Sequence, residues 1–202
     1  MSRLNDFAMQ ANMYVCLICK APSLVSVCSL CLGGLVRHRE STLRERDRIP
    51  VYSMLAWRDS GPRAVPWLVR SLKGCAQAED WSSVALLMLQ TFGLRKFRGI
   101  VPIPSPHSLG LARALSHWTG APILEVLHSG SPSGSQKRRS RRARQAVTFT
   151  IDPLAYGGSY ANVIICDDVV TTGATIRAAY RALGEPRDTQ AWCLADRLPC
   201  AG

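Results

Sequence analysis

The sequence predicts an α/β fold, in which a mostly parallel sheet is flanked by helices and preceded by a small cysteine-rich module. Two observations carry this prediction. Beyond residue 50, short apolar runs typical of strands alternate with segments of helical periodicity. Before it, four of the eight cysteines gather within a short stretch. Residues 33–50 are polar and charged and end at Pro50, so we expect a module over residues 1–50 and a body over residues 51–202.

The composition excludes several classes of protein. The chain has 202 residues, of which 47% are hydrophobic, which suits a packed core and not a disordered chain. It has no uninterrupted apolar run of about 18 residues, as a membrane-spanning helix would need, and its start lacks the pattern of a secretory signal. We therefore expect a cytoplasmic protein. The net charge of +11 favours a polyanionic partner or a phosphate-bearing ligand.

Each element of the body follows from a local pattern. Apolar residues at helical spacing, ended by glycine or a polar turn, predict the helices; short apolar or β-branched runs predict the strands. A segment rich in Ser, Gly, Pro and Arg over residues 129–144 predicts an exposed mobile loop. The expected helices span 65–72, 81–92, 108–118 and 176–183, and the expected strands span 99–104, 122–127, 162–168 and 190–195.

Two Cys-x-x-Cys pairs in the first fifty residues predict a metal site. Such a turn places two thiolates on one side of an ion, and two turns supply the four ligands of a tetrahedral zinc site with no open position, so we expect a structural zinc. The alternatives are buried thiols or redox-active pairs, and His38 could replace one ligand. The expected ligands are Cys16, Cys19, Cys28 and Cys31.

The stretch VIICDDVVTTGAT over residues 163–175 is the most informative part of the body. Its apolar run predicts a buried strand that carries Asp167 and Asp168 to its carboxyl end, where open α/β sheets bind ligands. The small residues that follow lead into a helix, whose amino end suits a phosphate. Two adjacent carboxylates can accept the vicinal hydroxyls of a sugar, so we expect a phosphorylated pentose. The alternative is a plain turn with a helix cap.

This stretch resembles the 5-phosphoribosyl-1-pyrophosphate (PRPP) motif of the type I phosphoribosyltransferases. The resemblance implies that Asp167 and Asp168 hold the ribose hydroxyls and that the loop from Thr171 to Thr175 holds the 5′-phosphate, with magnesium arriving on the pyrophosphate. The expected PRPP-binding residues are Asp167, Asp168, Val169, Val170, Thr171, Thr172, Gly173, Ala174 and Thr175.

A four-cysteine head joined to such a body resembles the ComF family of competence proteins. LVRSLKG at 68–74 and IVPIPS at 100–105 also fall where this family has comparable segments. The resemblance implies a phosphoribosyltransferase-like sheet with a zinc-ribbon-like module. It also implies a role in natural transformation, where internalised single-stranded DNA is handled together with a competence helicase or other DNA-processing proteins. Residues 106–115 depart from the family, because they lack its Arg-Gly-Phe-Asn-Gln-like stretch near the pyrophosphate.

A run of cations within the expected loop is the candidate nucleic-acid contact. It contains six positive residues and no acid, and it could follow a phosphate backbone, although no aromatic residue lies between the cations to stack on bases. The alternative is a solvated basic loop. The run supplies Lys137, Arg138, Arg139, Arg141, Arg142 and Arg144.

Three functions remain open at the level of the sequence. The first is a ComF-like protein that binds single-stranded DNA and keeps a PRPP-type site. The second is a phosphoribosyltransferase that moves ribose 5-phosphate to a nitrogen acceptor; no nucleophile paired with a base is recognisable, but this transfer does not need one. The third is an adaptor that binds proteins through the cysteine module.

Overall fold

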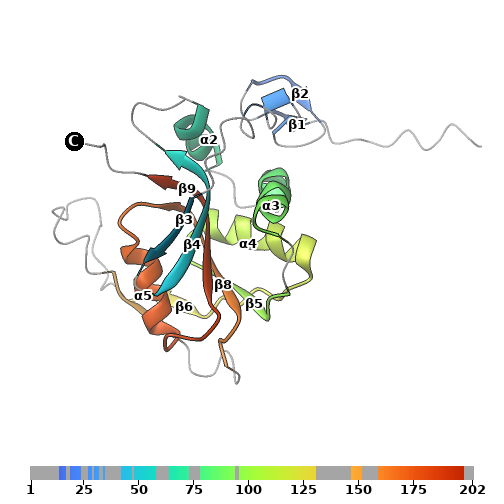
Figure 1. The fold of residues 1–202 in the computed structure, drawn as a ribbon. Helices are drawn as coiled ribbons and strands as arrows, with labels where there is room; N and C mark the ends of the chain where they lie inside the picture. The colour runs from blue at the N-terminus through green and yellow to red at the C-terminus, as the bar shows by residue number, and fades with distance from the viewer. Residues whose placement is uncertain are drawn as a thin grey trace, which may run out of the picture.

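The computed structural model contains one five-stranded sheet with helices on both faces (Figure 1). The strand order is β3-β4-β9-β8-β5; β3 and β4 are antiparallel, whereas β4, β9, β8 and β5 are all parallel. The structure describes residues 14–16, 19–23, 27–28, 30–31, 34, 42–46, 48–57, 64–72, 78–93, 96–130, 147–151 and 159–197. The strands of this sheet are β3 Thr42–Arg46, β4 Ile49–Trp57, β5 Gly99–Pro102, β8 Val163–Val170 and β9 Gln190–Arg197.

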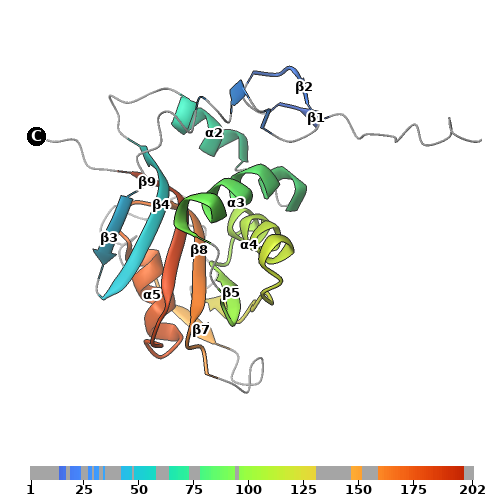
Figure 2. The same ribbon diagram turned by 45° about the vertical axis from the view of Figure 1, so that its right-hand side comes forward.

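The helices divide between the two faces of the sheet and bury a core on each (Figure 2). Helices α2, α3 and α4 cover one face and bury what we call the first core. Helix α5 and the short β6-β7 ribbon cover the other face and bury the second core. The alternation of side chains along β8 feeds both cores, since Ile164 packs in the first and Ile165 in the second. These elements are α2 Ala64–Leu72, α3 Ala78–Phe92, α4 Pro106–Thr119, α5 Ala174–Ala182, β6 Leu127–Ser129 and β7 Phe149–Ile151.

The predicted fold class is confirmed. The parallel strands, the flanking helices and the cluster of four cysteines are all present. Cys166 and Cys193 are fully buried in β8 and β9, as their apolar runs predict. None of the helices that the structure describes is long and apolar enough to cross a membrane.

The strand predicted over residues 122–127 is wrong for most of its length. Only Ile123 bridges to β5. In this bridge the Ile100 amide donates to the Pro122 carbonyl at 2.9 Å, and the Leu124 amide donates to the Ile100 carbonyl at 2.8 Å. Pro122 has no N–H to extend this ladder. The chain then turns away to pair β6 with β7.

The β3-β4 hairpin is a feature that the sequence reading missed. Strand β3 lies before residue 50, where we expect the module boundary, yet it pairs with β4 at the edge of the main sheet. Its sequence TLRER has the charges usual for an exposed edge strand, which hide it from a search for apolar runs. The division of the chain near residue 50 stays a prediction.

The cysteine-bearing segment packs against the face of the body that α2, α3 and α4 cover. Strands β1 Tyr14–Val15 and β2 Pro22–Ser23 form a small antiparallel ribbon. Val27 is fully buried in the first core, and the Lys20 ammonium lies 4.8 Å from the ring centroid of Trp67 in α2. The head and the first core are therefore in direct contact.

Candidate functional site

The candidate phosphoribosyl site lies at the carboxyl edge of the sheet, where β8 leads into α5. Strand β8 runs further than predicted and includes both acids. Asp167 is 8% exposed and Asp168 is half-buried. Val169 and Val170 continue the strand, and their side chains pack in the two cores. Parallel strands carry their ligand-binding loops at this edge.

A serine network ties the acid pair to the neighbouring β5-α4 turn. The Ser108 hydroxyl donates to Asp167 Oδ1 at 3.0 Å, and the Asp168 amide donates to the same oxygen at 2.9 Å. Ser105 caps α4 by accepting from the Ser108 amide at 3.1 Å, and its hydroxyl lies 2.9 Å from that of Ser108. Hydrogen bonds thus tie the acids to the turn that, by the family resemblance, lies near the pyrophosphate. Ser108 was missed by the sequence analysis.

Burial, and after it the negative charge of Asp168, together raise the pKa of Asp167 to about 7. The hydrogen bonds from the Asp168 amide and from Ser108 oppose this rise in pKa, because they stabilise the carboxylate. A carboxyl group with such a pKa exchanges its proton near neutral pH. It can therefore accept a hydrogen bond from a sugar hydroxyl as a carboxylate, or donate one when protonated.

The loop after β8 places two threonines and a glycine before the first turn of α5. Thr171 and Thr172 are exposed, and Gly173 has a φ of 76°, a left-handed conformation that glycine adopts without strain. The Thr172 hydroxyl accepts from the Ala174 amide at 3.3 Å. The first amides of α5 have no acceptor within the helix, and Thr175 lies in this first turn. The loop and helix start thus gather hydroxyls and amides beside the acids.

A cavity of 410 Å³ adjoins the β5-α4 turn. Its wall is mainly apolar and includes Ile103, Leu109 and Leu127, with Glu125 and His128 as its charged or titratable members. A wall of this composition suits a flat organic group with a few hydrogen-bonding atoms. His107, at the start of α4, has a buried Nδ1 with no hydrogen-bond partner among the described residues.

The four cysteines predicted as metal ligands come together. Their sulfur atoms all lie within 4.8 Å of one another, so this cluster could bind a metal ion. The sulfurs of Cys19 and Cys28 are 3.7 Å apart, and the Cys28 amide donates to the Cys16 sulfur at 3.3 Å. Zinc–sulfur bonds of about 2.3 Å in a tetrahedron place sulfurs about 3.8 Å apart, so the donor set fits zinc.

Desolvation and the neighbouring thiols raise the pKa of Cys31 to about 12. Thiols crowded in this way resist ionisation on their own, and a bound cation reverses this by stabilising the thiolates. All six residues of the basic run lie outside the described part of the chain.

Solved structures of phosphoribosyltransferases overlap with this chain at low similarity. They include an adenine phosphoribosyltransferase (16% identity, TM-score 0.41, 82% of this chain and 89% of that one) and the enzyme from Rhodothermus marinus (17%, 0.40, 83% and 85%). A Trypanosoma cruzi hypoxanthine phosphoribosyltransferase is 16% identical, with a TM-score of 0.34 over 67% of this chain and 70% of that one. No protein-family model and no curated protein matches the chain.

Proposed function

We propose that this protein binds a phosphoribosyl ligand of the PRPP type, with magnesium, at the carboxyl edge of its sheet. One observation carries the proposal: Asp167 and Asp168 lie at the end of β8, directly before a threonine-bearing loop at the start of α5. The carboxylates suit the two ribose hydroxyls, and the amides at the start of α5 suit the 5′-phosphate. The two sets of groups follow one another directly along the chain, as the hydroxyls and the phosphate lie on one ribose 5-phosphate.

Each group has a distinct task in this proposal. The half-buried Asp168 carboxylate accepts hydrogen bonds from the ribose hydroxyls, and Asp167, held by Ser108, fixes the β5-α4 turn against the sugar. The hydroxyls of Thr171 and Thr172 and the amides of the first turn of α5 surround the phosphate. Magnesium, when bound with the ligand, neutralises the pyrophosphate. The apolar cavity beside the turn leaves room for an acceptor base.

A thermal shift tests the proposal. Magnesium and PRPP at about 100 times the dissociation constant stabilise a folded protein by about 2.7 kcal/mol, so the Tm should rise by about 5–10 °C. The double variant Asp167→Asn/Asp168→Asn should lose this rise, whereas Glu79→Gln, an exposed position on α3, should keep it. An equal rise in the double variant would contradict the site.

An assay of pyrophosphate release on the same protein sample distinguishes a transferase from a protein that only binds PRPP. A transferase releases pyrophosphate from PRPP only when a nitrogen acceptor is present, and each common nucleobase serves as a candidate acceptor. Release that disappears in Asp167→Asn/Asp168→Asn would assign transfer to this site. A protein that only binds PRPP shows the thermal shift without release.

We further propose a ComF-like role in handling internalised single-stranded DNA. The resemblance of the head and the PRPP motif to that family supports it, and so do the six cations between residues 137 and 144. Each phosphate contact to a single strand contributes about 0.7 to the slope of log affinity against log salt. Replacing Arg138, Arg139, Arg141 and Arg142 with Ala should lower the slope measured by fluorescence anisotropy by about 3. An unchanged slope would remove these arginines from the interface.

The proposed role of the cysteine cluster is structural zinc binding. A site with four thiolates has no open position for chemistry. Because Val27 of the head is buried in the first core and Lys20 lies over the Trp67 ring of α2, the metal should stabilise the body as well as the head.

A further inference from the structure

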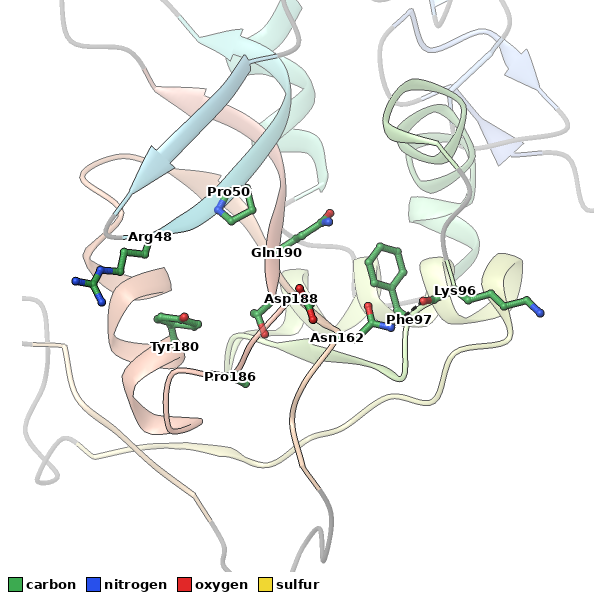
Figure 3. A pocket seen from close by; sticks show the side chains of 10 residues that line it. Arg48, Pro50, Lys96, Phe97, Asn162, Tyr180, Pro186, Asp188 and Gln190 are labelled. Carbon is green, nitrogen blue, oxygen red and sulfur yellow. Dashed lines mark hydrogen bonds between the residues drawn. The ribbon is translucent and has the colours of Figure 1, made fainter.

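A second cavity opens at the opposite edge of the sheet, where all four mutually parallel strands begin (Figure 3). Arg48 precedes β4, Lys96 lies shortly before β5, Asn162 precedes β8, and Asp188 and Thr189 precede β9. Its volume of 510 Å³ lies in the range of pockets that bind small molecules. We call it the amino-edge cavity. It is separated from the candidate phosphoribosyl site by the length of the sheet.

A smaller hollow of 220 Å³ continues the amino-edge cavity. The two share Arg48 and Tyr180, and the smaller one adds Arg177, Arg181 and Glu185. Three arginines and one acidic residue thus line a space of this size, although the guanidinium of Arg177 also donates to the Thr172 carbonyl at 3.0 Å. Arginine forks match the oxygens of a phosphate group, and a doubly charged phosphate balances such an excess of cations.

The amino-edge cavity itself is lined by groups suited to the organic part of a ligand. Figure 3 shows Arg48 and Lys96 at its opposite ends, with Asn162, Asp188 and Gln190 between them. An exposed carboxylate such as that of Asp188 accepts from hydroxyl or amino groups. Further walls come from apolar or aromatic side chains, which suit a ring; they are Pro50, Phe97, Tyr180 and Pro186.

One wall residue carries an unsatisfied polar group. Thr189 is 4% exposed, and its hydroxyl has no hydrogen-bond partner among the described residues. By contrast, the Asn162 side chain donates to the Lys96 carbonyl at 3.1 Å, and Gln190 accepts from the Trp192 indole at 3.2 Å. A buried hydroxyl without a partner destabilises the fold, and a ligand at this wall that displaces the atoms covering the hydroxyl would supply the partner.

The backbone around the two hollows is held in an unfavourable conformation. Arg48, Glu185 and Asp188 have φ values of 72°, 53° and 56°, in the left-handed region that favours glycine. Arg48 lies in the tight β3-β4 turn, where Gly or Asn is usual. An arginine at a position where glycine would cause less strain suggests that the Arg48 side chain has a function.

We propose that these two hollows together bind an organic phosphate of the size of a nucleoside monophosphate. The phosphate occupies the smaller hollow, between Arg48 and Arg181. The organic body occupies the amino-edge cavity, where it contacts Tyr180 and donates to Asp188. This site is independent of the proposed phosphoribosyl site, and either can exist without the other.

Isothermal titration calorimetry of the full chain with AMP, CMP, GMP and UMP tests this proposal. At least one nucleotide should bind with a dissociation constant below about 1 mM, and inorganic phosphate should bind at least ten-fold more weakly. The double variant Arg48→Gly/Arg181→Gln should weaken the nucleotide at least ten-fold. Arg177 is left unchanged, because it also donates to the Thr172 carbonyl at 3.0 Å near the other site.

The phosphoribosyl site could itself accept a nucleoside monophosphate, so each titration is repeated in Asp167→Asn/Asp168→Asn. Binding at the amino-edge cavity persists there and weakens at least ten-fold in Arg48→Gly/Arg181→Gln. Binding that depends only on the acid pair, or no binding of any of the four nucleotides, would overturn the proposal. Equal affinity for inorganic phosphate would also overturn it, since the larger cavity would then contribute nothing.

Thr189→Val provides a second and independent readout. Valine has nearly the same shape as threonine and lacks the unsatisfied hydroxyl, so the unliganded variant should have a higher Tm than the wild type. The rise in Tm that the nucleotide produces should be smaller in the variant. A variant with a lower Tm and an unchanged response to the nucleotide would contradict this role of the Thr189 hydroxyl.

Discussion

Replacing Asp167 with asparagine should stabilise the unliganded protein at alkaline pH. Asparagine keeps an oxygen that accepts from Ser108 and from the Asp168 amide, and it removes a charge that burial disfavours. The pKa of Asp167 rises from an ordinary value of 3.8 to about 7 in the folded protein. Between these pH values the folded state holds a proton that the unfolded state has released, so stability falls as pH rises and the full penalty applies above pH 7.

The magnitude follows from the size of this rise in pKa. One pKa unit corresponds to 1.36 kcal/mol, so the penalty is about 2 kcal/mol at pH 5 and about 4 kcal/mol at pH 8. Urea denaturation of the wild type and of Asp167→Asn at both pH values gives the free energies of unfolding. The variant should gain about 2–3 kcal/mol more at pH 8 than at pH 5. Any pH response of the cysteine cluster is common to both proteins and cancels in the difference.

Two controls accompany this measurement. Asp168→Asn removes only the second cause of the raised pKa, so its gain in stability should depend on pH more weakly than that of Asp167→Asn. Glu79→Gln, on the outside of α3, should show a gain near zero at both pH values. Parallel curves for Asp167→Asn and the wild type, or a loss of stability at pH 8, would refute the argument from buried charge.

Three further outcomes follow from the same contacts. Ser108→Ala removes a hydrogen bond to the Asp167 carboxylate, so it should lower the free energy of unfolding by about 2 kcal/mol at pH 8. The loss should be smaller at pH 5, because Asp167 is more often protonated there. An equal loss at both pH values would contradict this. Gly173→Ala places a side chain at a φ of 76°, which should cost about 1–2 kcal/mol and weaken PRPP binding, whereas Gly93→Ala, at a φ of 86° far from the site, should cost stability alone. Treatment with a zinc chelator should release about one zinc ion per chain and lower the Tm of the body, since the head contacts the first core; a chain that contains no metal after expression with zinc would refute the structural role.

The parts of the site that the sequence predicts are those written in consecutive residues. The acid pair, the threonine loop and the helix after it occupy one uninterrupted stretch, and their order along the chain equals their order in space. The cysteine cluster is similar, because two short turns bring its sulfurs together. The relative positions of the residues within each of these groups therefore depend little on tertiary contacts.

The parts that the sequence did not predict depend on contacts between distant residues. Ser108 meets Asp167 only because β5 and β8 are neighbours, although 59 positions separate the two in the chain. One local signal was available, since Ser105 before Pro106 is a typical helix start and would have moved the start of α4 from 108 to 106. The amino-edge cavity is built from the residues before four separate strands, so no segment of the sequence contains it.

The proposed phosphoribosyl site is tested most directly by a crystal structure of the protein with magnesium and PRPP. We expect the 5′-phosphate within hydrogen-bond distance of the loop from Thr171 to Thr175, and the ribose hydroxyls within hydrogen-bond distance of Asp168. A phosphate bound instead between Arg48 and Arg181, with the carboxyl edge empty at saturating PRPP, would contradict the account and leave the amino-edge cavity as the ligand site of this protein.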